Sequence, residues 1–353
     1  MSAQQQTTHR SGGMISRHEE HHAMEMGALN DTALSFRSGK AQSSKLRHGI
    51  VLGMAFIVVM AVVWWWFFVF NAPYRVMRMG GPLFNSNGQE EMYLVQTRTH
   101  PSFFILTLSP KKDVWVSKQI ITRGWWESAI EQTIEEVLGE FFSQSKDCTV
   151  IDVGGNIGFF SLLTAAWGCK VTTYEIQPEM VKRITASATI NAFHNVKVVN
   201  KGVASTSGNL IKFQLGSFDN MGSAYAAKAS ENDENAVTTV TLDEEFSEII
   251  KKKTRITMLK IDVEGYEPDV LDGAVQLIHY VDNVVVEANS QSVLTKLVSA
   301  GFNKVTVLEE PRWFWSFFVK RAPSRTFINP TEAELRDYLS HLQGKRDVWF
   351  RRV

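Results

Sequence analysis

From residue 150 onward, apolar and polar positions alternate in blocks. Short apolar runs rich in β-branched residues, such as Val150–Val153 and Val284–Val286, are typical of strands buried on both faces. Segments with helical spacing separate these runs, and this alternation predicts an α/β domain with a mainly parallel sheet. We expect seven strands, at residues 150–153, 170–175, 196–200, 256–261, 283–287, 304–308 and 347–351.

The segment before the first of these strands has a different pattern. Residues 92–121 alternate apolar and polar positions, and we interpret them, Val114–Val116 included, as a small β-ribbon. A helix is expected from about Ser128 to Phe142. Residues 71–91 contain Gly, Pro and Asn turn signals and are predicted to be a linker. The predicted folded domain therefore covers residues 92–353.

A long uncharged run covers residues 49–70 and ends in aromatic residues. As a helix that rises about 1.5 Å per residue, it would cross a hydrocarbon core of about 30 Å. We therefore predict a single transmembrane helix, preceded by a disordered polar tail over residues 1–48. By a small margin the basic residues lie mainly before this run: Arg37, Lys40, Lys45 and Arg47 precede it, and Arg75 and Arg78 follow it.

That charge asymmetry predicts a cytoplasmic N-terminus for a single-pass protein. The domain after the run would then face the lumen of the Golgi or of a related secretory membrane. A cytosol-facing domain is the alternative, because the asymmetry is small. Formal net charge is +0, which argues against a general nucleic-acid partner. The two cysteines, Cys148 and Cys169, do not make a disulfide framework, and we expect them to be small core residues.

Chemistry is first indicated by the glycine turn after the first strand. Gly154, Gly155 and Gly158 follow the strand, with Asn156 between them, and a helical segment begins at Phe159. Such a turn lets a ligand approach the backbone at a helix N-terminus. Asp152 precedes the turn, and a carboxylate there disfavours an anionic pyrophosphate. It favours a cationic ligand, and S-adenosylmethionine carries an ammonium and a sulfonium without any phosphate.

Acidic residues also end two other predicted strands. Glu175 ends the second strand, about 20 residues after the glycine turn, which suits a carboxylate that binds ribose hydroxyls. The fourth strand ends in Lys260, Asp262 and Glu264, which alternation places on one side. Because ligands of open α/β sheets bind at the carboxyl ends of the strands, we expect Asp152, Glu175 and Asp262 to share one crevice.

These motifs resemble the FkbM-type family of S-adenosylmethionine-dependent methyltransferases. The resemblance covers about residues 114–353 and is carried by Asp152–Gly158, Glu175–Pro178 and above all Lys260–Gly265. It implies a Rossmann-like, seven-stranded class I methyltransferase sheet and an enzyme that methylates hydroxyl oxygens, often of sugars. Gly155 stands where the family often has alanine, and we expect the turn to tolerate this glycine. Ile176 falls in the cofactor-binding segment but departs from the family pattern.

The resemblance and the strand ends together suggest a mechanism. A sugar hydroxyl is a poor nucleophile while protonated, so a base or a divalent metal should assist its attack. Asp262 or Glu264 would be the base, and Lys260 or Tyr266 would orient the acceptor. The spacing does not decide between a base and a metal ligand. His194 and His279 are further candidates, although their positions beside helix ends favour a surface or core role.

The function predicted from the sequence is that of a membrane-anchored O-methyltransferase acting on a glycan or glycoconjugate hydroxyl. Three alternatives stay open. One is a cytosol-facing methyltransferase of a lipid, protein or small metabolite, and another is a non-catalytic anchored binding module. The third is a nicotinamide oxidoreductase, which would need a glycine spacing that this chain lacks.

Overall fold

A computed structural model describes most of the chain after residue 50. The described residues are 51, 53–64, 76–79, 92–143, 147–217, 220–288, 290–309, 324–341 and 346–353. The chain divides into two compact units, Met1–Pro73 and Tyr74–Val353. In the first unit, residues 53–64 form a helix with exposed side chains.

The predicted membrane span is only partly within the described residues. Among these residues, none of the helices combines the length and the apolar character that a bilayer crossing needs. Residues 65–70, which complete the predicted span, lie outside the described residues. The predicted tail, residues 1–48, and most of the predicted linker also lie outside them.

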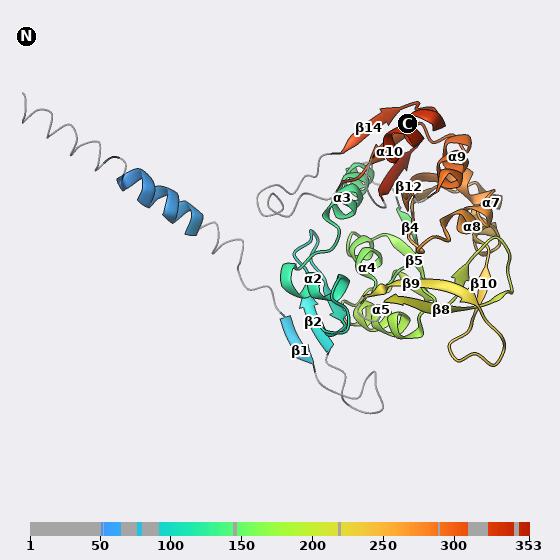
Figure 1. Ribbon diagram of the computed structural model, residues 1–353, viewed down its shortest axis with the longest axis horizontal. Coiled ribbons are helices and arrows are strands. Elements are labelled where there is room, and N and C mark those ends of the chain that lie inside the picture. The colour runs from blue at the N-terminus through green and yellow to red at the C-terminus, as the bar shows by residue number, and fades with distance from the viewer. Residues whose placement is uncertain are drawn as a thin grey trace, which may run out of the picture. The chain divides into compact units, whose positions relative to one another are not determined.

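The second unit is built on an eight-stranded sheet with the order β14-β13-β15-β12-β11-β4-β5-β6 (Figure 1). Five neighbouring strands, from β12 to β6, are parallel, whereas β13, β14 and β15 form antiparallel pairs. The strands span Thr149–Val153 (β4), Lys170–Tyr174 (β5), Val196–Val199 (β6), Ile256–Ile261 (β11), Val281–Glu287 (β12), Lys304–Val307 (β13), Arg325–Ile328 (β14) and Asp347–Arg351 (β15).

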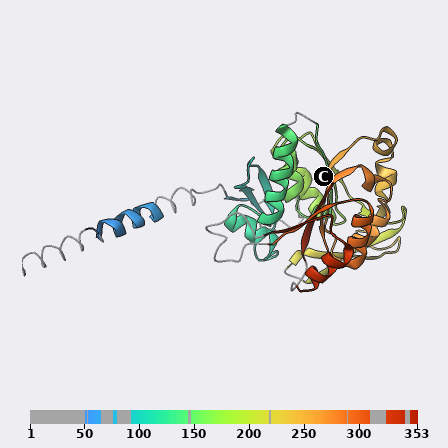
Figure 2. The ribbon, with the colours of Figure 1, turned by 90° about the horizontal axis from the view of Figure 1, so that it is seen from above.

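Helices cover both faces of this sheet (Figure 2). Each face has its own apolar core, because the central strands are buried on both sides. The helices span Val116–Arg123 (α2), Ser128–Ser143 (α3), Phe159–Ala166 (α4), Pro178–Ile190 (α5), Leu242–Glu245 (α6), Ser247–Lys252 (α7), Glu267–Asp272 (α8), Leu277–Tyr280 (η1, a 3-10 helix), Gln291–Ser299 (α9) and Glu332–Ser340 (α10).

All seven predicted strands are present and lie in this one sheet. The eighth strand, β14, was not predicted. It pairs with β13 at the edge of the sheet, and its side chains are largely exposed, so it lacks the buried apolar run that marked the others.

The N-terminal part of this unit departs from the sequence prediction in two places. A three-stranded ribbon contains β2 (Met92–Gln96) and β3 (Phe104–Thr107), as expected, but also β1 (Val76–Met79), which lies within the predicted linker. The predicted strand at Val114–Val116 is wrong, because α2 begins at Val116. The physical reason is Asp113, whose buried carboxylate accepts hydrogen bonds from the first backbone amides of this helix.

A second, smaller sheet has the order β7-β10-β8-β9. It contains the hairpin of β8 (Leu210–Ser217) and β9 (Asn220–Lys228), flanked by β10 (Val237–Val240) and the short β7 (Gly202–Val203). This sheet matters for function because β7 follows β6 directly and leads the hairpin to the carboxyl ends of the parallel strands.

Cys148 and Cys169 form a disulfide, so the expectation of two unpaired core residues is corrected. Both residues are buried, as expected. They immediately precede β4 and β5, which are neighbours in the sheet, and their Cα atoms are 4.7 Å apart. The bond therefore links the amino ends of the two strands whose carboxyl ends carry the glycine turn and Glu175.

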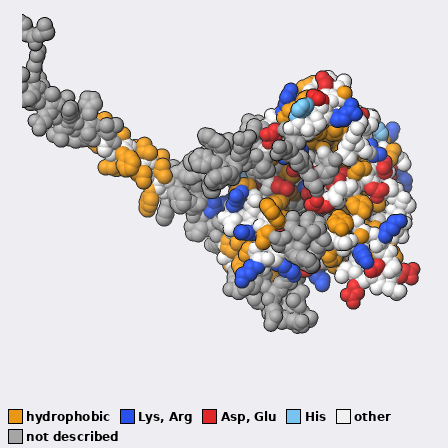
Figure 3. All heavy atoms as spheres, in the orientation of Figure 1, with side chains coloured by type: hydrophobic (Ala, Val, Ile, Leu, Met, Phe, Trp, Pro, Cys, Tyr) orange, Lys and Arg blue, Asp and Glu red, His pale blue; other side chains and the backbone are white. Residues whose placement is uncertain are grey.

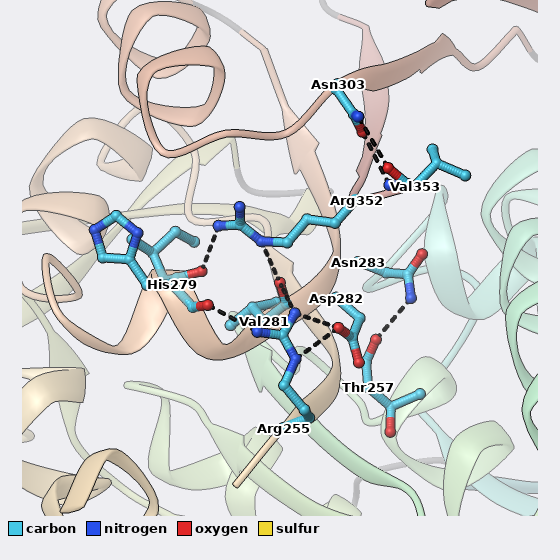
Figure 4. A network of polar contacts seen from close by, with 10 residues as sticks. Arg255, Thr257, His279, Val281, Asp282, Asn283, Asn303, Arg352 and Val353 are labelled. Carbon is cyan, nitrogen blue, oxygen red and sulfur yellow. Dashed lines mark hydrogen bonds and ion pairs between the residues drawn. The ribbon is translucent and has the colours of Figure 1, made fainter. Parts of the chain in front are cut away.

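Arginine side chains hold the amino ends of β11 and β12 (Figure 4). Arg255 Nε donates to Asp282 Oδ1 at 2.8 Å, and its Nη1 donates to the carbonyl of His279 at 2.8 Å. Arg352 Nε donates to the carbonyl of Val281 at 3.0 Å. These contacts lie at the end of the sheet opposite to the glycine turn and fix the β11–β12 pair in register.

Candidate active site

The glycine turn joins β4 to α4 and exposes its backbone at the start of the helix. Gly154 and Gly158 have φ of +85° and +91°, and Asn156 also has positive φ, at +51°. The amides of Gly154 and Gly155 donate to the carbonyl of Tyr174 at 3.0 and 3.1 Å. The turn is thus fastened to the end of β5, which brings Glu175 beside it.

Two of these glycines are required by close neighbours. A Cβ on Gly154 would lie 1.8 Å from the carbonyl oxygen of Asp262, so the turn and the end of β11 touch backbone to backbone. A Cβ on Gly155 would lie 2.2 Å from Thr173 Oγ1. Glycine rather than the family's frequent alanine suits this position, because Thr173 of β5 occupies the space that a Cβ would need.

Glu175 lies at the end of β5, buried between the turn and α5. Its Oε2 accepts from the amide of Asn156 at 2.8 Å, and its Oε1 accepts from the amide of Gln177 at 2.8 Å. Burial raises the pKa of Glu175 to about 7, partly opposed by these hydrogen bonds and reinforced by the negative charge of Asp152. The carboxyl group is therefore poised to change its charge near neutral pH.

Lys260 links the two other strand-end acids. Its side chain is 5% exposed, and its Nζ lies 3.1 Å from Asp262 Oδ2 and 3.8 Å from Asp152 Oδ1. It also lies over the ring of Phe160, 5.3 Å from the centroid. Burial lowers the pKa of Lys260, but the carboxylates of Asp262 and Asp152 outweigh burial and raise it overall. Lys260 therefore stays charged and serves to position these acids.

Asp152 lies beneath the crevice and does not line it. Its Oδ2 accepts from Ser161 Oγ at 2.6 Å, and its Oδ1 faces the lysine. The structure therefore places Asp152 among buried partners, whereas the sequence suggested direct contact with a cationic ligand. Its negative charge still reaches the crevice, because it acts on the pKa of Glu175.

One pocket of about 590 Å³ is lined by most of the other predicted residues, although Gly155, Gly158 and Lys260 are not among its lining residues. Gly154, Asn156, Glu175, Ile176, Asp262 and Glu264 all line it. Tyr266 lines it as well and is partly exposed. His194 and His279 are exposed and lie outside the lining residues. The sequence thus identified the residues from the parallel strands that meet in one hollow.

The sequence did not identify the opposite wall of this pocket. That wall comes from the second sheet and from the segment after β6, and its members are Lys201, Gly202, Val203, Ala204, Asn209, Leu210, Ile211, Ala226, Ala227, Lys228, Ala229 and Thr239. Small and apolar side chains predominate. No catalytic motif marks them, because their role depends on the hairpin folding back over the strand ends.

The loop after β11 is held by one buried acid that the sequence did not single out. Glu267 Oε1 accepts from the amides of Val263 and Gly265 at 3.1 and 3.0 Å. Glu264 has φ of +53° and lies between them. These two hydrogen bonds to Glu267 hold the loop that carries Asp262 and Glu264 at the pocket.

These residues fit S-adenosylmethionine. A pocket of this size is in the usual range for cofactors. Asn156 Oδ1 is buried and has no hydrogen-bond partner among the described residues, so it is available to a ligand. Glu175, Asp262 and Glu264 give the lining acidic character, which suits a sulfonium and an ammonium. Within the described part of the chain, no group of three or more His, Cys, Asp or Glu residues is arranged to hold a metal ion.

Fold and pocket together define a methyltransferase that uses S-adenosylmethionine. The family model described as the methyltransferase FkbM domain matches residues 152–342, more than half of the chain. The chain belongs to this family. The match begins at Asp152 and includes the glycine turn, Glu175 and the Lys260–Gly265 segment.

The solved structures to which this chain is similar are distant from it. A SAM-dependent methyltransferase from Agrobacterium tumefaciens shares 9% identity over 74% of this chain and 70% of its own, with a TM-score of 0.40. The magnesium protoporphyrin IX methyltransferase of Synechocystis PCC 6803, solved with bound SAM, shares 12% identity over 67% of this chain and 84% of its own, with a TM-score of 0.34. No curated protein matches the chain.

Proposed function

We propose that the protein is a membrane-anchored O-methyltransferase that acts on a hydroxyl of a glycan or glycoconjugate. The observation that carries this proposal is the carboxylate of Asp262, held at the pocket rim by the buried Lys260 ammonium at 3.1 Å. When bound, S-adenosylmethionine supplies an electrophilic methyl group on its sulfonium. A fixed proton acceptor beside the alcohol assists its attack on this methyl group by taking the hydroxyl proton.

Asp262 suits that role because only one of its two carboxylate oxygens accepts a hydrogen bond within the described residues. Oδ2 is occupied by Lys260, which is its only hydrogen-bond partner within the described residues, so Oδ1 can receive the hydroxyl proton. Lys260 fixes the carboxylate and keeps a positive charge of its own. Glu264, on the same loop, would orient the acceptor from the rim. Glu175 and Asn156 would hold the cofactor.

The lumenal orientation is part of the proposal. Disulfides persist in secretory compartments and are rare in the cytosol, so the buried Cys148–Cys169 bond supports a domain that folds in the lumen. The basic residues before residue 49 agree with a cytoplasmic N-terminus. We further propose that residues 49–70 provide the anchor, on the strength of their uncharged sequence.

Methyl transfer to glycans tests the activity. The full chain, purified in detergent, is incubated with isotopically labelled S-adenosylmethionine and a panel of glycans, and the products are sequenced by mass spectrometry. We expect a methyl ether on a sugar hydroxyl. Asp262→Asn should abolish it while binding of S-adenosylhomocysteine persists. Label found only on nitrogen, on lipid or on protein would overturn the proposed acceptor.

Sealed vesicles test the orientation. We expect protease to spare the catalytic domain until detergent is added, and Cys148 and Cys169 to resist alkylation until reduction. Digestion of the domain in intact vesicles, with both cysteines alkylated, would favour the cytosol-facing alternative.

A further inference from the structure

A basic and aromatic surface lies at the start of α2, outside the pocket. It consists of Lys111, Lys112, Trp115 and Lys118, which we call the α2 patch. All four side chains are exposed, and Trp115 is 59% exposed despite its large apolar ring. Neither the methyl transfer nor the cofactor site accounts for these residues.

Local structure fixes the α2 patch in place. The amides of Lys112 and Asp113 donate to the carbonyl of Ser109 at 2.9 and 3.0 Å, which closes a tight turn. The Asp113 carboxylate accepts from the amides of Trp115, Val116 and Ser117. These bonds direct Asp113 inward and leave Trp115 outside. Lys118 follows Trp115 by three positions, so the two share one face of the helix.

The α2 patch carries positive charge that is only partly compensated. Within the described part of the chain, Lys111 and Lys118 make no ion pair, whereas Lys112 Nζ pairs with Glu179 Oε1 at 3.8 Å. Figure 3 shows Lys and Arg side chains gathered over α2 and the first strands, whereas acidic side chains gather nearer the centre of the same face.

The ion pair also connects the α2 patch to the pocket. Glu179 is the second residue of α5, and Gln177, two positions earlier, lines the pocket. Arg183 Nη2 donates to the same Glu179 oxygen at 2.8 Å and keeps it in position. The α2 patch is therefore joined, through Lys112 and Glu179, to the first turn of the helix that follows the Glu175–Gln177 wall of the pocket.

We propose that the α2 patch binds an anionic glycan chain whose hydroxyl is presented to the pocket. Lysines attract carboxylate or sulfate groups on the sugars, and the exposed indole offers a flat apolar face to the C–H face of a sugar ring. This inference rests on the proposed function and adds to it that the acceptor is acidic and longer than one sugar. Methylation would then depend on contacts remote from the reacting oxygen.

Direct binding tests this proposal without requiring turnover. The full chain in detergent is titrated with a heparin oligosaccharide, as a probe rich in carboxylate and sulfate, and with a neutral maltooligosaccharide of equal length. We expect binding of the acidic probe only, weakened by added salt because exposed charges are screened. Equal binding of both probes, or of neither, would overturn the proposal.

Matched variants locate the binding surface. Lys111→Gln with Lys118→Gln, and separately Trp115→Ala, should each weaken heparin-oligosaccharide binding about tenfold, which corresponds to about 1.4 kcal/mol. Trp115→Phe should restore most of the affinity. The control, Lys251→Gln with Lys252→Gln, removes two exposed lysines from α7, where both pair with Glu248. The control should bind normally, and all variants should bind S-adenosylhomocysteine like the parent.

Specific outcomes decide against the α2 patch. If the control and the patch variants lose equal affinity for the heparin oligosaccharide, binding depends only on the overall charge of the protein. The assignment of the binding site to the α2 patch is then wrong. If the α2-patch variants bind vesicles of anionic lipid less well than the parent does, while all variants bind the oligosaccharide equally, the α2 patch binds a membrane surface and the glycan proposal is wrong. If the acidic probe binds through the α2 patch but no glycan is methylated, the proposed function fails and the binding surface stands.

Discussion

The carbonyl oxygen of Asp262 lies where a side chain on Gly154 would begin. A Cβ there would be 1.8 Å from that oxygen, and the glycine already has a left-handed φ of +85°. The glycine turn and the candidate base are therefore positioned by one backbone contact. Gly154→Ala should displace Asp262 and reduce stability, cofactor binding and turnover together.

Gly208 provides a matched control for this substitution. Its φ is +84°, but a Cβ there meets nothing within 4 Å. Both alanine variants should lose about 1–2 kcal/mol from the left-handed conformation. Only Gly154→Ala should lose about 1–3 kcal/mol more from overpacking. Chemical denaturation measures both, and equal losses would show that the contact with Asp262 is unimportant.

Gly155 and Thr173 should be energetically coupled. Gly155→Ala places a methyl group against Thr173 Oγ1, at a distance of 2.2 Å. This oxygen is buried and has no hydrogen-bond partner among the described residues, so its removal costs little. We expect Gly155→Ala to destabilise the domain by about 1–3 kcal/mol and Thr173→Ala to relieve most of that loss. Additive effects in the double-mutant cycle would contradict this packing.

Cofactor binding should depend on pH through Glu175, whose pKa burial raises to about 7. A ribose hydroxyl donates best to the ionised carboxylate, so affinity for S-adenosylhomocysteine should increase as pH rises from about 6 to about 8. Glu175→Gln should bind more weakly and lose this pH dependence. Calorimetry at several pH values measures it, and a parallel dependence in the glutamine variant would remove Glu175 as its origin.

The same shift predicts how the stability of the ligand-free domain varies. The pKa of Glu175 in the folded state lies above its ordinary value of 4.5, so between these two values the folded state binds more protons than the unfolded state. Its contribution is favourable below that window and decreases as pH rises towards about 7. Glu175→Gln should flatten this part of the stability profile measured by denaturation.

Lys260 should be required for folding as well as for activity. Lys260→Met leaves the buried Asp152 carboxylate without its cation, 3.8 Å away, and should destabilise the domain by about 3–5 kcal/mol. Adding Asp152→Asn to that variant should recover part of the stability but no activity, because Asp262 stays without its positioning ammonium. Exposed Lys251→Met is the control and should be nearly neutral. Normal stability of Lys260→Met would contradict this view.

The sequence predicted those parts of the fold that depend on local patterns. The central strands β4, β11 and β12 were recognisable from their apolar, β-branched runs, because burial on both faces leaves little room for polar residues. The acids Glu175 and Asp262 were recognised at the strand ends for the same reason: the apolar pattern stops where the pocket begins.

Features that depend on tertiary contacts escaped prediction. The disulfide joins residues 21 positions apart, and only the neighbouring positions of β4 and β5 bring Cys148 to Cys169. Likewise, nothing in the sequence around Ala227 indicates a pocket wall. Asp152 matched a ligand-binding pattern, but its charge is met by a lysine from β11, which lies more than a hundred residues later in the chain.

The position of β15 has a consequence for biosynthesis. This strand, Asp347–Arg351, lies between β12 and β13 in the sheet. Its position in the sheet therefore cannot be filled until residue 351 has been translated. Until then β12 and β13 each present an unpaired edge to other chains. A nascent domain of this design therefore exposes two strand edges until late in its synthesis, and fusions placed close after Arg351 risk obstructing the insertion of β15.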